Sequence, residues 1–138
     1  MSSYVEHANI TVTDLNRTIA FLQTAMPDFF VRGGGKDELS AWCHIGSETS
    51  YIALEEELID KPVDRISHSQ LGVNHIGFVV EDATRVAENL KAAGFKQVSF
   101  DESHPSRKRA YFYDTDGIQW EFIEYLTDDF GSRNDYVL

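Results

Sequence analysis

The sequence predicts an α+β fold built from two copies of one βαβββ unit. Three observations lead to this prediction: a stretch near the N-terminus recurs at an offset of 68 residues, each copy opens with alternating apolar and polar residues, and an amphipathic segment follows each alternation. Alternation indicates a half-buried strand, and apolar residues spaced by three or four indicate a helix. The two copies predict one domain over residues 1–138. It comprises module one at about 4–56, a linker at 57–72, module two at about 73–126 and a tail at 127–138.

The repeat is visible in the residues themselves. Residues 5–14 read VEHANITVTD, and residues 73–82 read VNHIGFVVED. The identities fall at places that have the same structural purpose in each copy, which makes chance a weak explanation. The aligned pairs are Val5 with Val73, His7 with His75, Val12 with Val80 and Asp14 with Asp82.

Each copy begins with a strand followed by a helix. Asp14 and Asp82 have the character of helix N-caps, because their carboxylates can accept hydrogen bonds from the first free N–H groups. Pro27 ends the first helix, and Gly94 is the expected C-terminal cap of the second. The apolar face of each opening strand must pack on its helix. The histidine of that strand must therefore point to the other face of the sheet.

Three further strands are expected after each helix. They span about 29–32, 41–46 and 50–55 in the first copy, and about 96–100, 109–113 and 118–126 in the second. Gly33-Gly34-Gly35 predicts a turn between the first two of these strands, and Asp114-Thr115-Asp116-Gly117 predicts a hairpin turn between the last two. The polar tail shows no pattern of regular structure.

The residues that carry chemistry are predicted to be His7, His75 and Glu121. Both copies place a histidine at the same position of the same strand, and Glu121 projects from the face of the last strand that does not pack on a helix. Two imidazoles and one carboxylate suit a first-row divalent metal with open positions for water or substrate. Alone, each of these residues would be an ordinary surface or structural residue. The duplication favours a metal site.

These motifs resemble those of the vicinal-oxygen-chelate superfamily, which includes glyoxalases, bleomycin resistance proteins and extradiol dioxygenases. The resemblance rests on Val-x-His near the start, on Gly-Val-Asn-His-Ile-Gly-Phe in the second copy, and on Asp-Thr-Asp-Gly-Ile-Gln-Trp-Glu-Phe near the end. It implies a curved mixed sheet, a half-barrel formed by the two βαβββ modules around one divalent metal (Fe, Mn, Zn or Ni). It also implies a homodimer.

The sequence departs from the glyoxalase-type lyases at the fourth ligand, which in that branch is a carboxylate on the last strand of the first module. At the offset of 68 the residue equivalent to Glu121 is Ala53. Glu55 lies two residues further along and would become a ligand only if the strand register slipped; a solvated strand end is the alternative. The general base is unknown. Glu55 and Tyr113 are the main candidates, and the weaker ones are Tyr125, His44 and His104.

A basic cluster precedes the hairpin turn in this otherwise acidic chain. Arg107 and Arg109 are candidates for binding a substrate anion, because arginine can hold a carboxylate or phosphate through two hydrogen bonds. The alternative is a solvated hairpin whose charges balance acidic neighbours. Trp42, Tyr51 and Tyr111 either line the pocket or belong to the core.

Composition excludes several classes of partner. The formal net charge is −11, so we expect no nucleic acid and no anionic membrane as partner. The N-terminus shows no signal-peptide pattern, and the single cysteine, Cys43, fits a cytoplasmic protein. The first hypothesis is a metal-dependent lyase or isomerase acting on a small, oxygen-rich, anionic substrate. The alternatives are a non-haem Fe(II) extradiol-type dioxygenase and a non-catalytic small-molecule binding or resistance protein.

Overall fold

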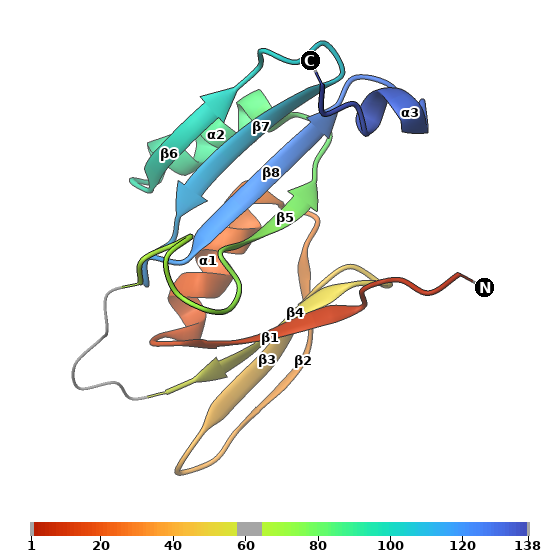
Figure 1. The fold of residues 1–138 in the computed structure, drawn as a ribbon. Helices are drawn as coiled ribbons and strands as arrows, with labels where there is room; N and C mark the ends of the chain where they lie inside the picture. Colours follow the sequence, from red (N-terminus) through yellow and green to blue (C-terminus); the bar gives the residue numbers. More distant parts are fainter. Residues whose placement is uncertain (1, 58–64, 138) are drawn as a thin grey trace. The chain divides into compact units, whose positions relative to one another are not determined.

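The computed structural model describes residues 2–57 and 65–137. By its internal contacts the chain divides into two compact units, residues 1–63 and 64–138, which we call unit 1 and unit 2. Each unit has the predicted βαβββ order, so the α+β prediction is confirmed (Figure 1). That the two units form one domain stays a prediction. Residues 58–64 of the predicted linker lie outside the described residues.

Each unit contains one four-stranded mixed sheet. In unit 1 the strands lie in the order β1-β4-β3-β2, and in unit 2 in the order β5-β8-β7-β6. The first and last strands of each unit are parallel neighbours, and the other pairs are antiparallel. The strands of unit 1 are β1 (His7–Val12), β2 (Phe30–Lys36), β3 (Ala41–Gly46) and β4 (Tyr51–Glu56). Those of unit 2 are β5 (His75–Val79), β6 (Lys96–Asp101), β7 (Arg107–Tyr113) and β8 (Gln119–Tyr125).

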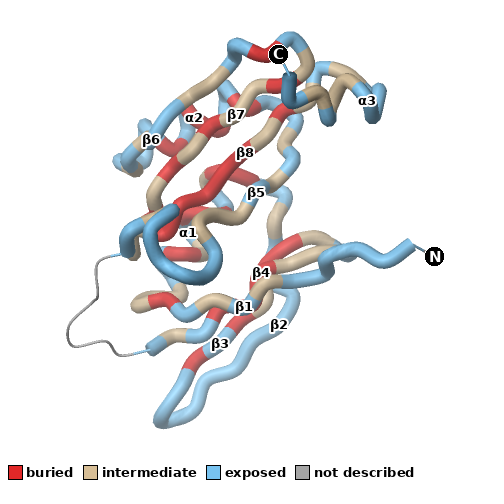
Figure 2. Tube along the Cα trace, in the orientation of Figure 1, coloured by how far each residue is buried: buried red, intermediate tan, exposed pale blue. Residues whose placement is uncertain are grey.

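One helix covers one face of each sheet. Helix α1 (Leu15–Ala25) packs on β3 and β4, and helix α2 (Ala83–Ala92) packs on β6, β7 and β8. The buried side chains between helix and sheet form the core of each unit, and Figure 2 shows the buried stretch along β8. The largest buried apolar side chains are Val12, Phe21, Leu22, Ile45 and Leu54 in unit 1, and Leu90, Phe112, Trp120 and Phe122 in unit 2. Among the described residues, none of the helices combines the length and apolarity that a bilayer crossing requires.

Both helices begin as the sequence predicts. The side chain of Asp14 accepts a hydrogen bond from the Arg17 N–H, and that of Asp82 accepts one from the Arg85 N–H. Helix α2 ends before Gly94, whose φ of 91° is the left-handed conformation that glycine adopts without steric cost.

A second pair of carboxylates extends the repeat and was not foreseen. Glu56 Oε2 accepts a hydrogen bond from the Leu15 N–H at 2.9 Å, and Glu124 Oε1 accepts one from the Ala83 N–H at 3.1 Å. Both glutamates lie on the last strand of their unit and also contact the start of its helix. A negative charge there satisfies a free N–H group and interacts favourably with the helix dipole. These two residues therefore join helix and sheet in each unit.

The turn predicted at Gly33-Gly34-Gly35 is wrong, because these glycines lie within β2. The chain reverses at residues 37–40, where Asp37 Oδ1 accepts hydrogen bonds from the N–H groups of Leu39 and Ser40. Gly34 and Gly35 instead allow the close approach of Trp42 on β3. A Cβ atom on Gly34 would lie 2.7 Å from the backbone oxygen of Trp42, and one on Gly35 would lie 2.7 Å from Trp42 Nε1, so either would force a neighbouring group to shift.

Two other expectations need correction. The tail was expected to lack regular structure, but it contains a short helix, α3 (Phe130–Arg133), which Asp129 caps. Strand β7 begins at Arg107 and not at Arg109, because the backbone N–H of Leu126 donates to Ser106 O and the pairing of β7 with β8 extends to Arg107 and Tyr125.

The hairpin turn between β7 and β8 is confirmed, and Asp114 organises it. Its buried carboxylate accepts hydrogen bonds from the backbone N–H groups of Asp116 and Ile118 and from Trp120 Nε1, each at 2.9 Å. Burial raises the pKa of Asp114, and the three hydrogen bonds oppose that shift. Gly117 completes the turn with a φ of 75°. The turn is thus joined to the core through the indole of Trp120, one residue before Glu121.

Candidate metal site

Unit 2 brings together two of the three predicted metal ligands. His75 begins β5, and Glu121 lies on the neighbouring strand β8. His75 Nε2 and Glu121 Oε2 are 2.9 Å apart. The His75 side chain is 29% exposed and the Glu121 side chain is buried. The pair lies on the sheet face that α2 does not cover, because Glu124 on the other face of β8 contacts the start of that helix. The period-two prediction that Glu121 shares a face with His75 agrees with this contact.

A small residue opposite Glu121 leaves space for its carboxylate. Gly77 pairs with Glu121 in the parallel ladder, and a Cβ atom on Gly77 would lie 3.4 Å from Glu121 Oε2. The same register in unit 1 pairs Asn9 with Ala53. Ala53 therefore occupies in unit 1 the position that Glu121 has in unit 2. In unit 1 the larger residue of the pair, Asn9, is on the first strand and the smaller one, Ala53, is on the last strand. In unit 2 the order is reversed, with Gly77 on the first strand and Glu121 on the last.

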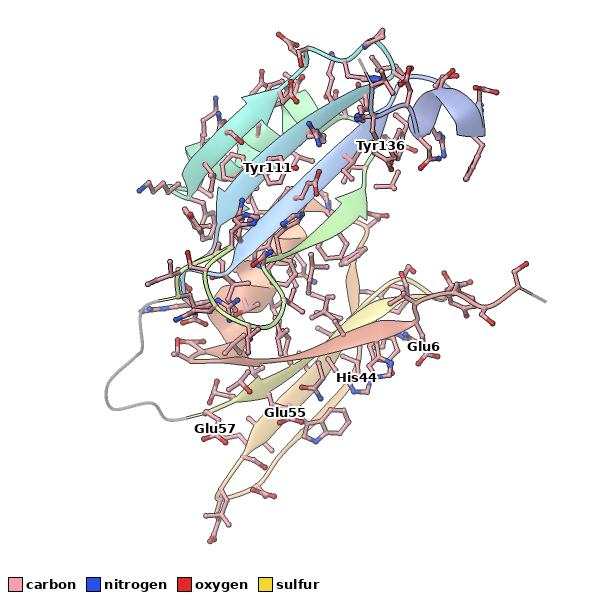
Figure 3. All side chains as sticks on the ribbon, viewed as in Figure 1. Glu6, His44, Glu55, Glu57, Tyr111 and Tyr136 are labelled. Carbon is pink, nitrogen blue, oxygen red and sulfur yellow. The ribbon has the colours of Figure 1, made fainter. Side chains whose placement is uncertain are left out.

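Tyr111 contacts both residues of the pair. Its hydroxyl donates a hydrogen bond of 2.8 Å to Glu121 Oε1, and its ring meets the His75 ring edge-on with centroids 5.5 Å apart. Figure 3 shows Tyr111 on β7. Burial, and then the nearby Glu121 carboxylate, raise the pKa of Tyr111 to about 12. The hydroxyl thus keeps its proton at neutral pH and remains a donor.

Arg109 lies on the same strand face, two residues before Tyr111. Its Nη2 is 2.7 Å from Asp101 Oδ2, and both side chains are about one-third exposed. The Ser103 hydroxyl donates to Asp101 Oδ1 at 2.6 Å. These hydrogen bonds, first from Ser103 and then from Arg109, hold the pKa of Asp101 well below its ordinary range. Arg109 is therefore a positioned guanidinium beside the His75 and Glu121 pair, and its role in anion binding stays a prediction.

Arg107 is engaged with the tail of the chain. It is buried, and its Nη1 donates hydrogen bonds of 3.1 Å to the carbonyl oxygens of Arg133 and Asp135. Its guanidinium also lies 5.3 Å from the centre of the Tyr136 ring. The structure thus gives Arg107 a role in fixing residues 127–137 to β7. Its predicted contact with substrate stays a prediction.

Replacing Arg107 with alanine should loosen the tail. Two carbonyl oxygens would lose their donor, and a hydrogen bond to a charged group contributes about 1.5–3 kcal/mol. We expect faster amide hydrogen exchange over residues 127–137, measured by mass spectrometry. Arg109→Ala is the matched control, since Arg109 pairs with Asp101. Equal exchange of the tail in both variants would show that Arg107 does not hold it.

His7 lies in unit 1, at the start of β1. Its ring stacks on Tyr51 with centroids 4.9 Å apart, and its Nδ1 is 3.0 Å from Glu6 Oε1. The Tyr51 hydroxyl donates to the same Glu6 oxygen at 3.3 Å. A carboxylate on Nδ1 favours the tautomer whose Nε2 is free to bind a metal. Among residues 2–57 and 65–137, no three side chains of His, Cys, Asp or Glu form a group that could hold an ion.

The two candidate bases lie in different units. Glu55 is in unit 1, where its Oε1 accepts a hydrogen bond of 3.1 Å from Asn9 Nδ2. Tyr113 is in unit 2, on the face of Tyr111 and Glu121, and pairs with Gln119 across the hairpin. Their assignment as ligand or base stays a prediction.

The remaining histidines have distinct surroundings. His44 stacks on Tyr51 with centroids 4.6 Å apart, and His104 Nδ1 accepts a hydrogen bond from the Ser106 N–H. His68 lies within the predicted linker and is exposed, and its ring centroid is 6.2 Å from that of His75. Its φ of 68° is uncommon for a residue other than glycine. No periodicity marks the loop before β5, so the sequence held no signal for this proximity.

Known proteins share this architecture. The family model of the glyoxalase/bleomycin resistance protein/dioxygenase superfamily matches residues 4–122, which is most of the chain. The chain belongs to this superfamily. The family resemblance read from the sequence is therefore confirmed. No curated protein sequence matches the chain.

Solved structures of this superfamily have the same fold. A glyoxalase/bleomycin resistance protein/dioxygenase domain from Frankia sp. EAN1pec is 24% identical, with a TM-score of 0.72 over 91% of this chain and 99% of that one. A glyoxalase family protein from Bacillus cereus is 17% identical, with a TM-score of 0.73 over 89% and 94%. The fosfomycin resistance protein FosX from Listeria monocytogenes, complexed with Mn(II) and sulfate, is 24% identical, with a TM-score of 0.69 over 98% and 100%.

Proposed function

We propose that this superfamily member is a divalent-metal-dependent lyase or isomerase acting on a small, oxygen-rich, anionic substrate. His75 and Glu121 supply two metal ligands and His7 supplies the third. The observation that carries the proposal is the 2.9 Å approach of His75 Nε2 to Glu121 Oε2 on the sheet face that α2 does not cover. We further propose that the protein acts as a homodimer in the cytoplasm.

The pair fits a metal in donor type and in spacing. Imidazole nitrogen and carboxylate oxygen bind a first-row ion at about 2.0–2.2 Å, so two such donors at a right angle are about 3 Å apart. The distance between His75 Nε2 and Glu121 Oε2 is 2.9 Å. His75 Nδ1 is buried and has no hydrogen-bond partner among the described residues, and Nε2 is the nitrogen that faces the carboxylate. An ion can replace the hydrogen bond between these atoms without a large movement of either side chain.

The surrounding residues support an anionic substrate. A divalent ion at this site would act as a Lewis acid on neighbouring substrate oxygens. Arg109, held by Asp101, would bind a carboxylate or phosphonate group, because guanidinium pairs well with planar or tetrahedral oxyanions. Tyr113 lies on the same strand face and pairs with Gln119, two residues before Glu121, so it is a candidate within unit 2 to move a proton. The Listeria FosX complex contains Mn(II) and sulfate, which makes Mn(II) the first metal to test.

Metal analysis of the purified full-length protein tests the proposal. After incubation with Mn(II), Fe(II), Zn(II) or Ni(II) and removal of free ion, we expect about one ion per chain for at least one metal. His75→Ala should lose that ion, because a site with two remaining ligands binds weakly. His44→Ala is the control, since it removes an imidazole that is not a proposed ligand. A wild-type protein without metal, or equal loss in both variants, would reject the site.

Activity assays separate the alternatives. Oxygen uptake with a catechol after anaerobic iron loading would favour the extradiol dioxygenase. Tight binding of a small molecule that survives EDTA and His7→Ala would favour a non-catalytic binding or resistance protein. The proposed lyase or isomerase instead converts its substrate without oxygen and stops when the metal is removed.

A further inference from the structure

The carboxylate of Glu121 is held from two sides by residues of different strands. Oε2 faces His75 Nε2 of β5 at 2.9 Å, and Oε1 accepts the hydroxyl hydrogen bond of Tyr111 from β7 at 2.8 Å. Glu121 is buried, so few water molecules compete for its oxygens. Each oxygen thus has one specific neighbour, and the plane of the carboxylate is defined.

We propose that Tyr111 is a positioning residue that fixes the rotation of the Glu121 carboxylate so that Oε2 faces the metal. The inference rests on the proposed function, because it gives Glu121 the role of a ligand. The terminal torsion of a glutamate is broad and has no sharp preference of its own. One short hydrogen bond from Tyr111 to one oxygen therefore fixes the rotation of the carboxylate and leaves the other oxygen directed toward His75.

The comparison of the two units supports this role. Tyr111 pairs with Glu121 between β7 and β8, and at the equivalent register between β3 and β4 His44 pairs with Ala53. Unit 1 has Ala53 in place of the glutamate, and there the residue equivalent to Tyr111 is His44, which has no hydroxyl. The hydroxyl accompanies the residue that it orients, as expected of a partner that supports a metal ligand.

The ring of Tyr111 has a separate purpose from its hydroxyl. It packs edge-on against His75, with an angle of 80° between the rings. Phenylalanine at this position keeps the ring and removes only the donor. Tyr111→Phe therefore tests the hydrogen bond without opening a cavity beside His75.

Titration calorimetry with Mn(II) on the metal-free full-length protein tests the proposal. Tyr111→Phe should bind Mn(II) about 10–100-fold more weakly than wild type, the usual loss when a partner of a ligand is removed. The thermal midpoint of the metal-free variant should fall only modestly, because the substitution removes one hydrogen bond to the buried Glu121 carboxylate and leaves the ring in place. Tyr125→Phe is the matched control, because it removes a hydroxyl from the same face of β8, four residues from Glu121, which is about 13 Å along a strand.

The outcomes separate this inference from the proposed function. If wild type binds no Mn(II), the metal site and the role of Tyr111 fall together. If wild type binds Mn(II) and Tyr111→Phe binds it equally well, the metal site stands and the positioning role is rejected. A lower thermal midpoint of metal-free Tyr111→Phe with unchanged Mn(II) affinity would assign the hydroxyl to stability and would also reject the role.

Discussion

Replacing Glu121 with glutamine is expected to weaken Mn(II) binding by more than about 100-fold, which exceeds the loss typical of a residue that only supports a ligand. The amide keeps the size of the side chain but loses the negative charge that a divalent ion requires of this ligand. It can still accept the Tyr111 hydroxyl and contact His75. The fold should therefore remain, and the thermal midpoint of the metal-free protein should change little.

Glu124→Gln is the matched control, because Glu124 lies on the same strand and on the opposite face. Its Oε1 accepts the N–H of Ala83 at the start of α2. Loss of the charge at a helix N-terminus is expected to cost about 1 kcal/mol of unfolding free energy. Calorimetry and thermal denaturation on both variants should show opposite patterns: metal affinity lost with Glu121→Gln, stability lost with Glu124→Gln. Loss of metal affinity in both would place the site elsewhere.

Glu121 and Glu124 differ in how far their positions on β8 could be predicted from the sequence. Period-two alternation places Glu121 and Glu124 on opposite faces, and that prediction needs no knowledge of the neighbouring strands. The contact of Glu124 with α2 could not be predicted in the same way. It depends on the parallel pairing of β5 with β8, which brings the last strand of the unit beside the start of its helix. Such a contact joins residues about 40 apart and leaves no local pattern.

The contact of Tyr111 with Glu121 was missed for a similar reason. A two-residue hairpin turn at Thr115 and Asp116 would pair Tyr111 with Trp120 on the other face. In the structure Asp114 N donates to Ile118 O, so the loop is one residue longer and Tyr111 pairs with Glu121. A shift of one residue exchanges the two faces of a strand. The aspartate and glycine of the motif predict that a turn is present but do not decide its length.

The glycines of β2 are a case in which a local sequence pattern predicted a turn that the structure does not contain. Three consecutive glycines ordinarily indicate a turn, because glycine accepts unusual backbone angles. Here the need is steric: a side chain on Gly35 would collide with the ring of Trp42 on the adjacent strand. Only the cross-strand pairing of β2 with β3 reveals that need.

Replacing Asp114 with alanine is expected to give the largest loss of stability, about 3 kcal/mol. The carboxylate accepts three hydrogen bonds, and one of them comes from Trp120, whose side chain is fully buried. Without Asp114 the indole N–H would lose this acceptor in a fully buried position, and loss of the partner of a buried donor costs about 1–3 kcal/mol. The lost turn contacts add to this. The thermal midpoint should fall by about 10 °C.

Asp114→Asn gives a graded comparison. The amide has one acceptor oxygen, and its NH₂ group would face an N–H group that donates to the carboxylate in wild type. We therefore expect the stability of Asp114→Asn to lie between that of wild type and that of Asp114→Ala. Both variants should be measured without metal, so that stability is separated from ligand binding.

Because Trp120 and Glu121 are consecutive residues of β8, a turn released from the core should also disturb the Glu121 carboxylate. Asp114→Ala should therefore bind Mn(II) more weakly as well, although it removes no metal ligand. An Asp114→Ala protein as stable as wild type would show that the indole finds another acceptor.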